Sequence, residues 1–264
     1  MSAAEVPGPV AAVLDGAPSL FLSPHLDDAV LSCGVLLGRA ATAGRATVAT
    51  VFSAAAPGPH TRAARSFLRQ CTATGAEELF AARRAEDVEV VRAAGAEPVH
   101  LGRRDALFRT RRGPAGVLRR VAAVAPELTH RYPTFRFDIA RGRVAAAEHD
   151  LAGRIVDQVA ELVAGTRAQV VFCPLGVGRH VDHLLVRAVG PLLGDRVVYY
   201  ADFPYVERCR PEPAFLAAHR LRRWVCPDDP TLKRPLIEGY RTQVGALFPD
   251  GRIPARAEEY YTAG

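Results

Sequence analysis

The sequence of 264 residues has almost no lysine, although its net charge is +6. Lys233 is the only lysine, so arginine supplies all but one of the 34 basic residues. No run of five or six basic residues occurs, and 28 acidic residues lie among the arginines. An arginine-driven nucleic-acid binder is therefore the weaker interpretation. The preference for arginine over lysine, with abundant alanine, glycine and proline, is also typical of a genome rich in G and C.

The sequence also lacks paired cysteines, a long apolar run and a secretory signal. Its five cysteines include no C-x-x-C pair, and an odd number in a long chain does not indicate a disulfide framework. No stretch approaches the roughly 18 apolar residues of a membrane span. The N-terminal apolar stretch has no positive segment before it and contains prolines. We therefore expect a cytoplasmic protein with reduced thiols and no membrane span.

Apolar segments of two kinds alternate along the chain. With 49% hydrophobic and 23% charged residues, the sequence does not belong to the disordered class. Short apolar runs predict buried strands, and segments with helical spacing predict helices between them. This alternation predicts an α/β, Rossmann-like fold, with a mainly parallel, doubly wound sheet flanked by helices. Strands are expected at 19–23, 46–53, 98–101, 168–176 and 196–205, and helices at 28–44, 76–94, 148–164, 180–193 and 235–248.

The alternation contains no linker-like break, which predicts a single domain over residues 19–264. Residues 1–18 precede the first strand and are expected to form a flexible N-terminal segment. An arginine-rich excursion at about 103–147 interrupts the pattern with prolines, glycines and short apolar pieces. We expect this excursion to be irregular or partly helical and to cover one face of the sheet.

Two polar clusters follow expected strands of the sheet. His25, Asp27 and Asp28 come directly after the first strand, and His180, Asp182 and His183 come after the fourth. Ligands of open parallel sheets bind beyond the carboxyl ends of the strands, so both clusters are expected at one edge.

The residue types and spacing in these clusters suit a metal site. A strand-to-helix turn can bring His25 and Asp28 to one point, while Asp27 aims elsewhere and stays available for proton transfer. His180 and His183 share a helix face, so either could complete a site of two histidines and one aspartate. Such a site, with positions left for water, is typical of catalytic Zn²⁺. The sequence therefore predicts metal-assisted hydrolysis.

Each cluster also has an ordinary structural interpretation. Asp27 and Asp28 could be helix N-terminal carboxylates, which capping and the helix dipole favour. His180 and His183, taken alone, could simply lie at a partly exposed helix start. Because the two clusters converge at one predicted edge, we favour the combined site.

Four segments in order resemble the PIG-L/LmbE-like family of zinc-dependent de-N-acetylases. PHLDDAVLSCG resembles the family's H-x-D-D motif, and GRHVDH its H-x-D-H motif. AARRAEDVEVVRAAGAEPVHLGRRDALFR resembles its R-x-x-E-D helix, following strand and L-G-x-x-D turn, and YYADFPY resembles its late strand. Together these segments cover most of residues 19–205.

The resemblance implies roles for individual residues. His25, Asp28 and His183 would bind Zn²⁺ or another divalent metal such as Fe²⁺, and Asp27 would act as the general base. His180 would stabilise the oxyanion as a cation, with Asp182 holding its orientation and charge. The implied reaction is removal of an N-acetyl group from an N-acetylglucosaminyl conjugate, in natural-product or small-thiol metabolism.

Other features of the expected site depart from the family or stay open. Some members carry a tyrosine where this sequence has Gly178. Arg84, Asp105 and Arg109 are expected to bind the substrate, with solvated arginines and a loop-turn aspartate as the alternatives. The expected partner is a small amino-sugar conjugate, without nucleic acid, and formation of a homo-oligomer is left open. Two other functions also stay open: an amidase of a thiol conjugate, and a non-catalytic sugar- or nucleotide-binding protein.

Overall fold

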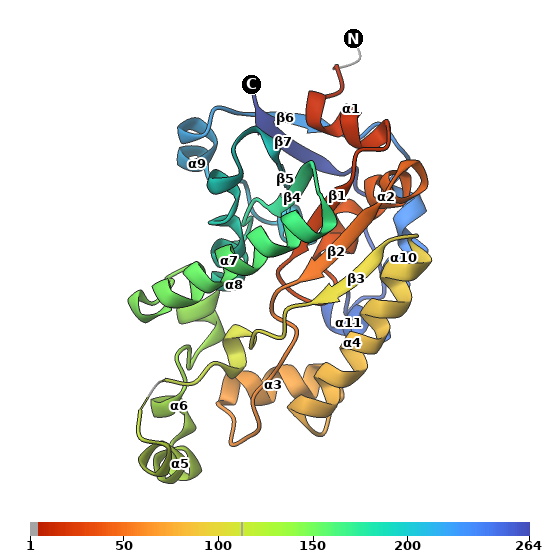
Figure 1. Cartoon of the computed structure of the whole chain (residues 1–264). Coiled ribbons are helices and arrows are strands. Elements are labelled where there is room, and N and C mark those ends of the chain that lie inside the picture. The colour runs from red at the N-terminus through yellow and green to blue at the C-terminus, as the bar shows by residue number, and fades with distance from the viewer. Residues whose placement is uncertain (1–4, 112) are drawn as a thin grey trace.

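The computed structural model describes residues 5–111 and 113–264, with a seven-stranded sheet at the centre (Figure 1). The strand order is β3-β2-β1-β4-β5-β7-β6. The first five strands of this order pair in parallel, whereas β7 is antiparallel to both of its neighbours. The mainly parallel, doubly wound α/β fold is thus confirmed. The strands are β1 (Ser19–Ser23), β2 (Ala46–Thr50), β3 (Glu97–His100), β4 (Val170–Pro174), β5 (Val197–Tyr200), β6 (Leu221–Val225) and β7 (Glu259–Ala263).

Strand β1 is buried on both faces, which explains its unbroken apolar run. Because successive side chains of a strand point to opposite faces, Phe21 packs into one core while Leu20 and Leu22 pack into another. Phe21 stacks on Phe172 of β4, with ring centroids 4.2 Å apart. The two cores lie under two separate layers of helices.

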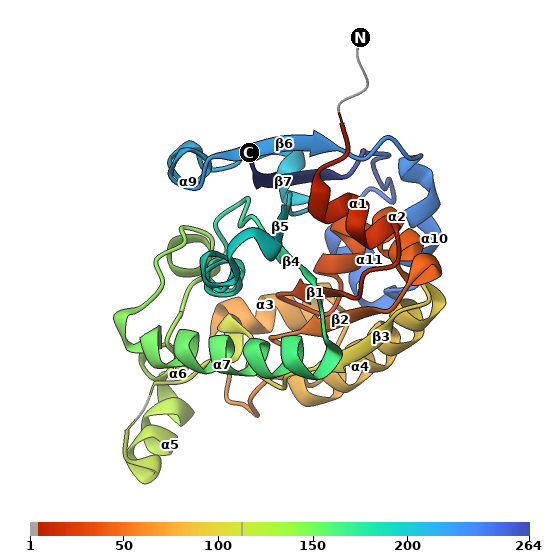
Figure 2. The same ribbon diagram turned by 45° about the horizontal axis from the view of Figure 1, so that its top comes forward.

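Helices cover both faces of the sheet, as Figures 1 and 2 show. One core includes buried residues of α1 (Gly8–Leu14), α2 (Asp28–Ala43), α4 (Ala76–Ala93) and α10 (Arg234–Glu238), with α11 (Arg241–Leu247) packed against it. The other includes residues of α7 (His149–Thr166) and α8 (Val181–Arg187), with α9 (Pro213–Ala218) packed against it. The expected helix at 180–193 ends early, because Gly190 and Pro191 interrupt it and a 3₁₀ segment follows.

Residues 5–18 differ from the flexible segment that we expected at 1–18. Gly8–Leu14 forms α1, and its Val10 and Val13 are fully buried against α2 and the sheet. The apolar pair at i and i+3 explains this docking, because both side chains lie on one helix face. Residues 1–4 of the expected segment lie outside the described residues.

The sequence pattern also missed several short elements. Helix α3 (Arg62–Gln70) follows β2, and β6 and β7 extend the sheet beyond β5. Strand β7 inserts between β5 and β6, so that Tyr260 pairs with both Tyr200 and Trp224. Elements of five residues near the end of the chain carry too little periodicity to be recognised from sequence.

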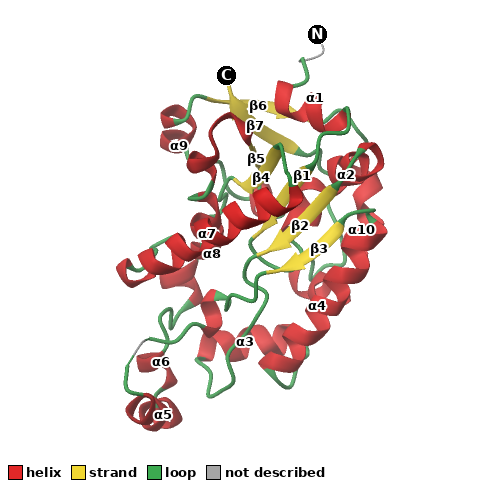
Figure 3. Cartoon of the chain, in the orientation of Figure 1, coloured by secondary structure: helices red, strands yellow, loops and turns green. Residues whose placement is uncertain are grey.

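The excursion at 103–147 is partly helical, as expected (Figure 3). Its short helices are η1 (Ala106–Phe108), α5 (Ala115–Val124), α6 (Pro126–Thr129), the single π-turn η2 (Phe135–Ile139) and η3 (Ala146–Glu148). Helix α5 projects from the body of the protein in both views (Figures 1 and 2). Among the described residues, no helix combines the length and apolarity of a membrane span.

Candidate functional site

Both polar clusters lie where the strand order of the doubly wound sheet reverses. Strand β1 pairs with β2 on one side and with β4 on the other, and the chain order runs outward from this point in both directions. Crevices at such switch points are the usual ligand sites of open α/β sheets. The segments after β1 and β4 therefore meet at one edge, as the sequence predicted.

The turn after β1 is closed by its own side chains. The Ser23 hydroxyl donates to the carbonyl oxygen of His25 at 2.6 Å and accepts from the amide of Ala29 at 3.0 Å. The Asp28 carboxylate accepts from the amide of His25 at 2.9 Å. These bonds hold the side chains of His25 and Asp28 on the same side of the turn.

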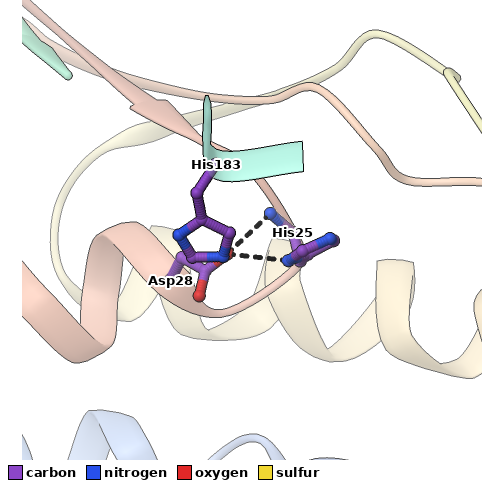
Figure 4. A group of neighbouring side chains, drawn as sticks. All are labelled: His25, Asp28 and His183. Carbon is purple, nitrogen blue, oxygen red and sulfur yellow. Dashed lines mark hydrogen bonds and ion pairs between the residues drawn. The ribbon is translucent and has the colours of Figure 1, made fainter. Parts of the chain in front are cut away.

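Three buried side chains from the two segments converge on one point (Figure 4). Asp28 Oδ2 lies 3.0 Å from His25 Nδ1 and 3.3 Å from His183 Nε2. His183 is fully buried, yet its Nε2 makes no hydrogen bond to any described residue. A buried nitrogen without a hydrogen bond, beside an imidazole and a carboxylate, is the donor set of a divalent metal site. The three residues expected to bind metal are thus brought together.

The two histidines of this group each contact a further carboxylate. His183 Nδ1 lies 2.6 Å from Asp202 Oδ1, just after β5. His25 Nε2 lies 3.2 Å from Asp182 Oδ2, which also accepts from the amide of Ala106 at 2.9 Å. Carboxylates in this position fix the tautomer and orientation of metal-binding histidines. The Asp182 carboxylate therefore holds His25, while the Asp182 amide donates to Nδ1 of His180, the histidine that the sequence analysis expected Asp182 to hold.

Asp27 lies next to the metal-binding group, buried, and points at a different partner. Its Oδ2 lies 3.6 Å from Nη2 of Arg83 on α4. Burial, reinforced by the neighbouring Asp28 carboxylate, raises the pKa of Asp27 to about 6. A carboxylate with this pKa can both accept and return a proton near neutral pH.

His180 lies at the start of α8, where it caps the helix. Its Nδ1 accepts a hydrogen bond from the amide of Asp182 at 3.2 Å. Burial and the positive charge on His25 lower the pKa of His180 well below its usual range. The bond from the Asp182 amide leaves Nε2 as the ring nitrogen that can donate a hydrogen bond, and the cationic form that the resemblance implied stays a prediction.

Asp105, Arg84 and Arg109 were expected to bind the substrate, and they lie in three different environments. Asp105 lines the cavity, and its Oδ2 is 3.6 Å from His25 Nε2. Arg84 donates to the carbonyl oxygen of Ser53 at 2.9 Å and does not line the cavity. Arg109 is buried behind Asp182 and is likewise outside the cavity lining.

Three functional candidates were missed from the sequence. Arg83 lines the cavity in place of its neighbour Arg84, and the R-x-x-E-D spacing could have selected it. Asp202 lies inside the segment expected as the fifth strand, and the structure places it just after β5, at the same sheet edge as the other clusters. Tyr205 packs its ring against Gly178, where an added Cβ would lie 2.5 Å from the tyrosine ring. Gly178 has φ +83°, so both space and backbone favour glycine there.

A cavity of about 510 Å³ contains the catalytic candidates. His25, Asp27, Asp28 and His180 line it, with Tyr205 nearby in the same wall. Larger open hollows occur on the described surface, for example around Ala160 and Leu193, and that hollow is lined by none of these residues. The reacting centre and the substrate space are therefore one cavity.

The fold and this site define an α/β protein with a candidate divalent-metal centre beside a buried carboxylate. The chain belongs to the PIG-L family, described as GlcNAc-PI de-N-acetylase, whose model matches residues 20–191. This match covers both polar clusters and the segment between them. The resemblance found in the sequence is confirmed at the level of the family.

One similar curated protein agrees with this assignment, and two similar solved structures agree with the fold. A 2′-N-acetylparomamine deacetylase of Streptomyces fradiae is 32% identical over 194 residues, which are 71% of this chain and 57% of that protein. The chain thus spans a little over half the length of this curated relative. The crystal structure of the A40926 pseudoaglycone deacetylase matches with a TM-score of 0.68 and 22% identity, over 94% of this chain and 97% of that one. The zinc-inhibited form of a teicoplanin deacetylase matches with a TM-score of 0.71 and 20% identity, over 92% and 97%.

Proposed function

We propose that this protein is a metal-dependent hydrolase that removes an N-acetyl group from an amino-sugar conjugate, with zinc as the metal. The observation that carries the proposal is the group of His25, Asp28 and His183 beside the free carboxylate of Asp27, inside one cavity. Membership of the PIG-L family and the deacetylase activity named for the curated relative support it.

The ligand chemistry of the site suits zinc. Two imidazole nitrogens and one carboxylate are a common ligand set of catalytic Zn²⁺, which keeps further positions for water or substrate. When bound, the ion would act as a Lewis acid toward the amide carbonyl and toward water. Asp182 and Asp202 would hold His25 and His183 in the orientation that presents one ring nitrogen of each to the metal.

The protein's own residues would move the protons of the reaction. Asp27 would accept a proton from the attacking water as the water oxygen bonds to the carbonyl carbon. As the C–N bond breaks, Asp27 would return this proton to the leaving nitrogen, giving acetate and a free amine. His180 would donate a hydrogen bond from Nε2 to the developing oxyanion. Arg83 would keep the Asp27 carboxylate oriented through their contact.

Replacement of Asp27 by asparagine tests this assignment. Asp27→Asn keeps the shape of the side chain but cannot act as a base, so turnover should fall by about 10²–10⁴-fold. Bound metal should stay at about one ion per chain. His183→Ala should lose both metal and turnover, because it removes a ligand. Acetate release from N-acetylglucosaminyl conjugates and metal content by elemental analysis are the measurements, and near-normal deacetylation by Asp27→Asn would contradict the role of the base.

The same experiment separates the other functions that the sequence left open. Stoichiometric metal with no acetate release from any N-acetylated sugar would favour a non-catalytic binding protein. Amine release from thiol conjugates alone would favour the thiol-conjugate amidase. Elemental analysis of protein prepared without added metal would distinguish zinc from iron.

A further inference from the structure

Two helices outside the reacting centre contribute one face each to the cavity. Helix α3 provides Ala63, Ser66, Phe67 and Gln70, whose spacing of i, i+3, i+4 and i+7 is one face of a helix. Helix α11 provides Gln243, Ala246 and Leu247, at i, i+3 and i+4. Neither face carries a charged side chain. We call these seven residues the neutral wall.

The neutrality of this wall is notable because its helices are rich in charge elsewhere. Helix α3 has three arginines among its nine residues, Arg62, Arg65 and Arg69, and none of them lines the cavity. Arg241 of α11 lies 3.0 Å from the carboxylate of Glu89 on the protein surface. The charged side chains of both helices therefore lie outside the faces that line the cavity.

The carboxylates that do line the cavity are gathered at the reacting centre. Asp27 contacts Arg83, and Asp28 contacts His25 and His183. Asp105 lies beside His25. The seven residues of the neutral wall therefore offer no carboxylate to a polycationic group, and Arg83 and Arg136, which line the same cavity, would repel it.

Apolar side chains add a contact surface to the wall. Phe67 and Leu247 line it from the two helices, and both are only partly buried. The Phe67 ring also lies against the Arg83 guanidinium, 5.8 Å from its centroid. Phe135 of η2 also lines the cavity; it is 45% exposed, and its ring centroid lies 6.0 Å from that of His180. Aromatic and aliphatic side chains of this kind bind the apolar face of a sugar or aryl group through area removed from water.

We propose that the neutral wall is the binding site for the group attached to the N-acetylated sugar, and that this group carries no positive charge and has an apolar or aromatic face. This inference rests on the proposed function, since it identifies the class of conjugate that the same cavity hydrolyses. A polycationic aminocyclitol is excluded as the preferred partner of the wall.

The first test compares conjugates that differ only in the attached group. With the metal-loaded full chain, kcat/KM for phenyl N-acetyl-β-glucosaminide should exceed that for free N-acetylglucosamine by about tenfold, the effect of about 1.4 kcal/mol of added contact. It should also exceed kcat/KM for 2′-N-acetylparomamine. Equal values for the phenyl conjugate and the free sugar, or a preference for the aminocyclitol, would overturn the inference while leaving the proposed deacetylation intact.

A variant of the neutral wall tests whether its lack of charge causes the preference for the phenyl conjugate over the cationic conjugate. Gln70→Glu is isosteric, and Gln70 is exposed, so the change adds one carboxylate without disturbing packing. The ratio of kcat/KM for the phenyl conjugate to that for the cationic conjugate should fall about threefold, because the new charge attracts the cation. Gln158→Glu on α7 is the matched control, since Gln158 accepts from Arg103 and does not line the cavity. An unchanged ratio in Gln70→Glu would contradict the inference.

Binding without hydrolysis keeps the two proposals distinguishable. Phenyl β-glucoside has no amide to cleave, and calorimetry should detect its binding to the wild-type chain about tenfold more tightly than that of methyl β-glucoside. If no N-acetylated compound is hydrolysed but this preference appears, the proposed function fails and the neutral wall stands. If the phenyl group adds no affinity, the neutral wall is overturned.

Discussion

The buried guanidinium of Arg109 gives the sharpest prediction about stability. Its Nη2 lies 2.5 Å from Asp182 Oδ1, and its Nε lies 2.9 Å from Glu148 Oε1. The guanidinium also stacks over the rings of Phe52 and Tyr132, at 4.9 and 5.4 Å from their centroids. Burial favours the neutral form, but the two carboxylates outweigh it and raise the pKa of Arg109. Arg109 therefore neutralises two buried carboxylates at once.

Arg109→Gln would leave both carboxylates without this cation. Removing one partner of a buried ion pair typically costs about 3–5 kcal/mol, because the other charge stays buried without compensation. His25 still lies beside Asp182 and Arg131 beside Glu148, so we expect the free energy of unfolding to fall by about that amount and no more, which corresponds to a Tm roughly 6–20 °C lower. Arg109→Lys keeps the charge but cannot span two carboxylates, so it should lower the free energy of unfolding by less than Arg109→Gln does.

Urea and thermal unfolding of the full chain measure this effect. The matched control is Arg234→Gln, because Arg234 and Glu238 form an i, i+4 pair at 2.9 Å with both side chains at least half exposed. This exposed pair should contribute no more than about 0.5 kcal/mol. If Arg109→Gln destabilised the protein by less than 1 kcal/mol, as roughly expected for an exposed pair, the reasoning from burial would be refuted.

Two further regions of the site give predictions that single substitutions can test. Asp202→Asn should weaken metal binding about 10–100-fold, measured by competition with a chelator, because it removes the carboxylate that orients His183; unchanged affinity would contradict this role. Gly178→Ala should cost about 1–3 kcal/mol in urea unfolding, because φ is +83° and the new Cβ would meet Tyr205 at 2.5 Å. Tyr205→Phe should lower kcat with little change in KM if the hydroxyl assists the oxyanion, and an unchanged kcat would exclude that role.

The sheet and the metal-binding residues could be predicted because both follow local rules. Buried parallel strands are short apolar runs, and the carboxyl ends of β1 and β4 must meet at one edge. His25, Asp28 and His183 were therefore identifiable before their contacts were known. Asp27 could be separated from Asp28 because adjacent side chains point in different directions.

The partners of these residues could not be assigned in the same way. Asp182 contacts His180, two positions before it, through its amide, as sequence proximity suggests. Its carboxylate also contacts His25, which is 157 positions away, and this contact depends on the fold. Similarly, Arg83 and Arg84 differ by one position, and the rotation of about 100° per residue along α4 decides which reaches the cavity.

Strands β6 and β7 and the wall helix α3 have no comparable sequence signal. Strand β7 is only five residues long, and it belongs to the sheet because Tyr260 and Tyr261 pair with β5. In the sequence, α3 is a short basic segment. Its arginines lie away from the cavity only because of how the helix packs. Tertiary context determines these elements.

The contacts of Arg109 also join the two ends of a long segment of the excursion. The chain leaves the body at Arg109 and returns at Glu148, and these two residues contact each other at 2.9 Å. The Tyr132 hydroxyl donates to Glu148 at 2.8 Å and secures the middle of the segment to the same point. Because closing a longer loop costs only about 0.6 kcal/mol per doubling of its length, the exposed parts of this segment can be lengthened at little cost, provided that the buried Tyr132 and Ile139 are kept. Loop grafting between 110 and 147, with the anchors kept, is thus a route to new substrate ranges on an unchanged metal centre.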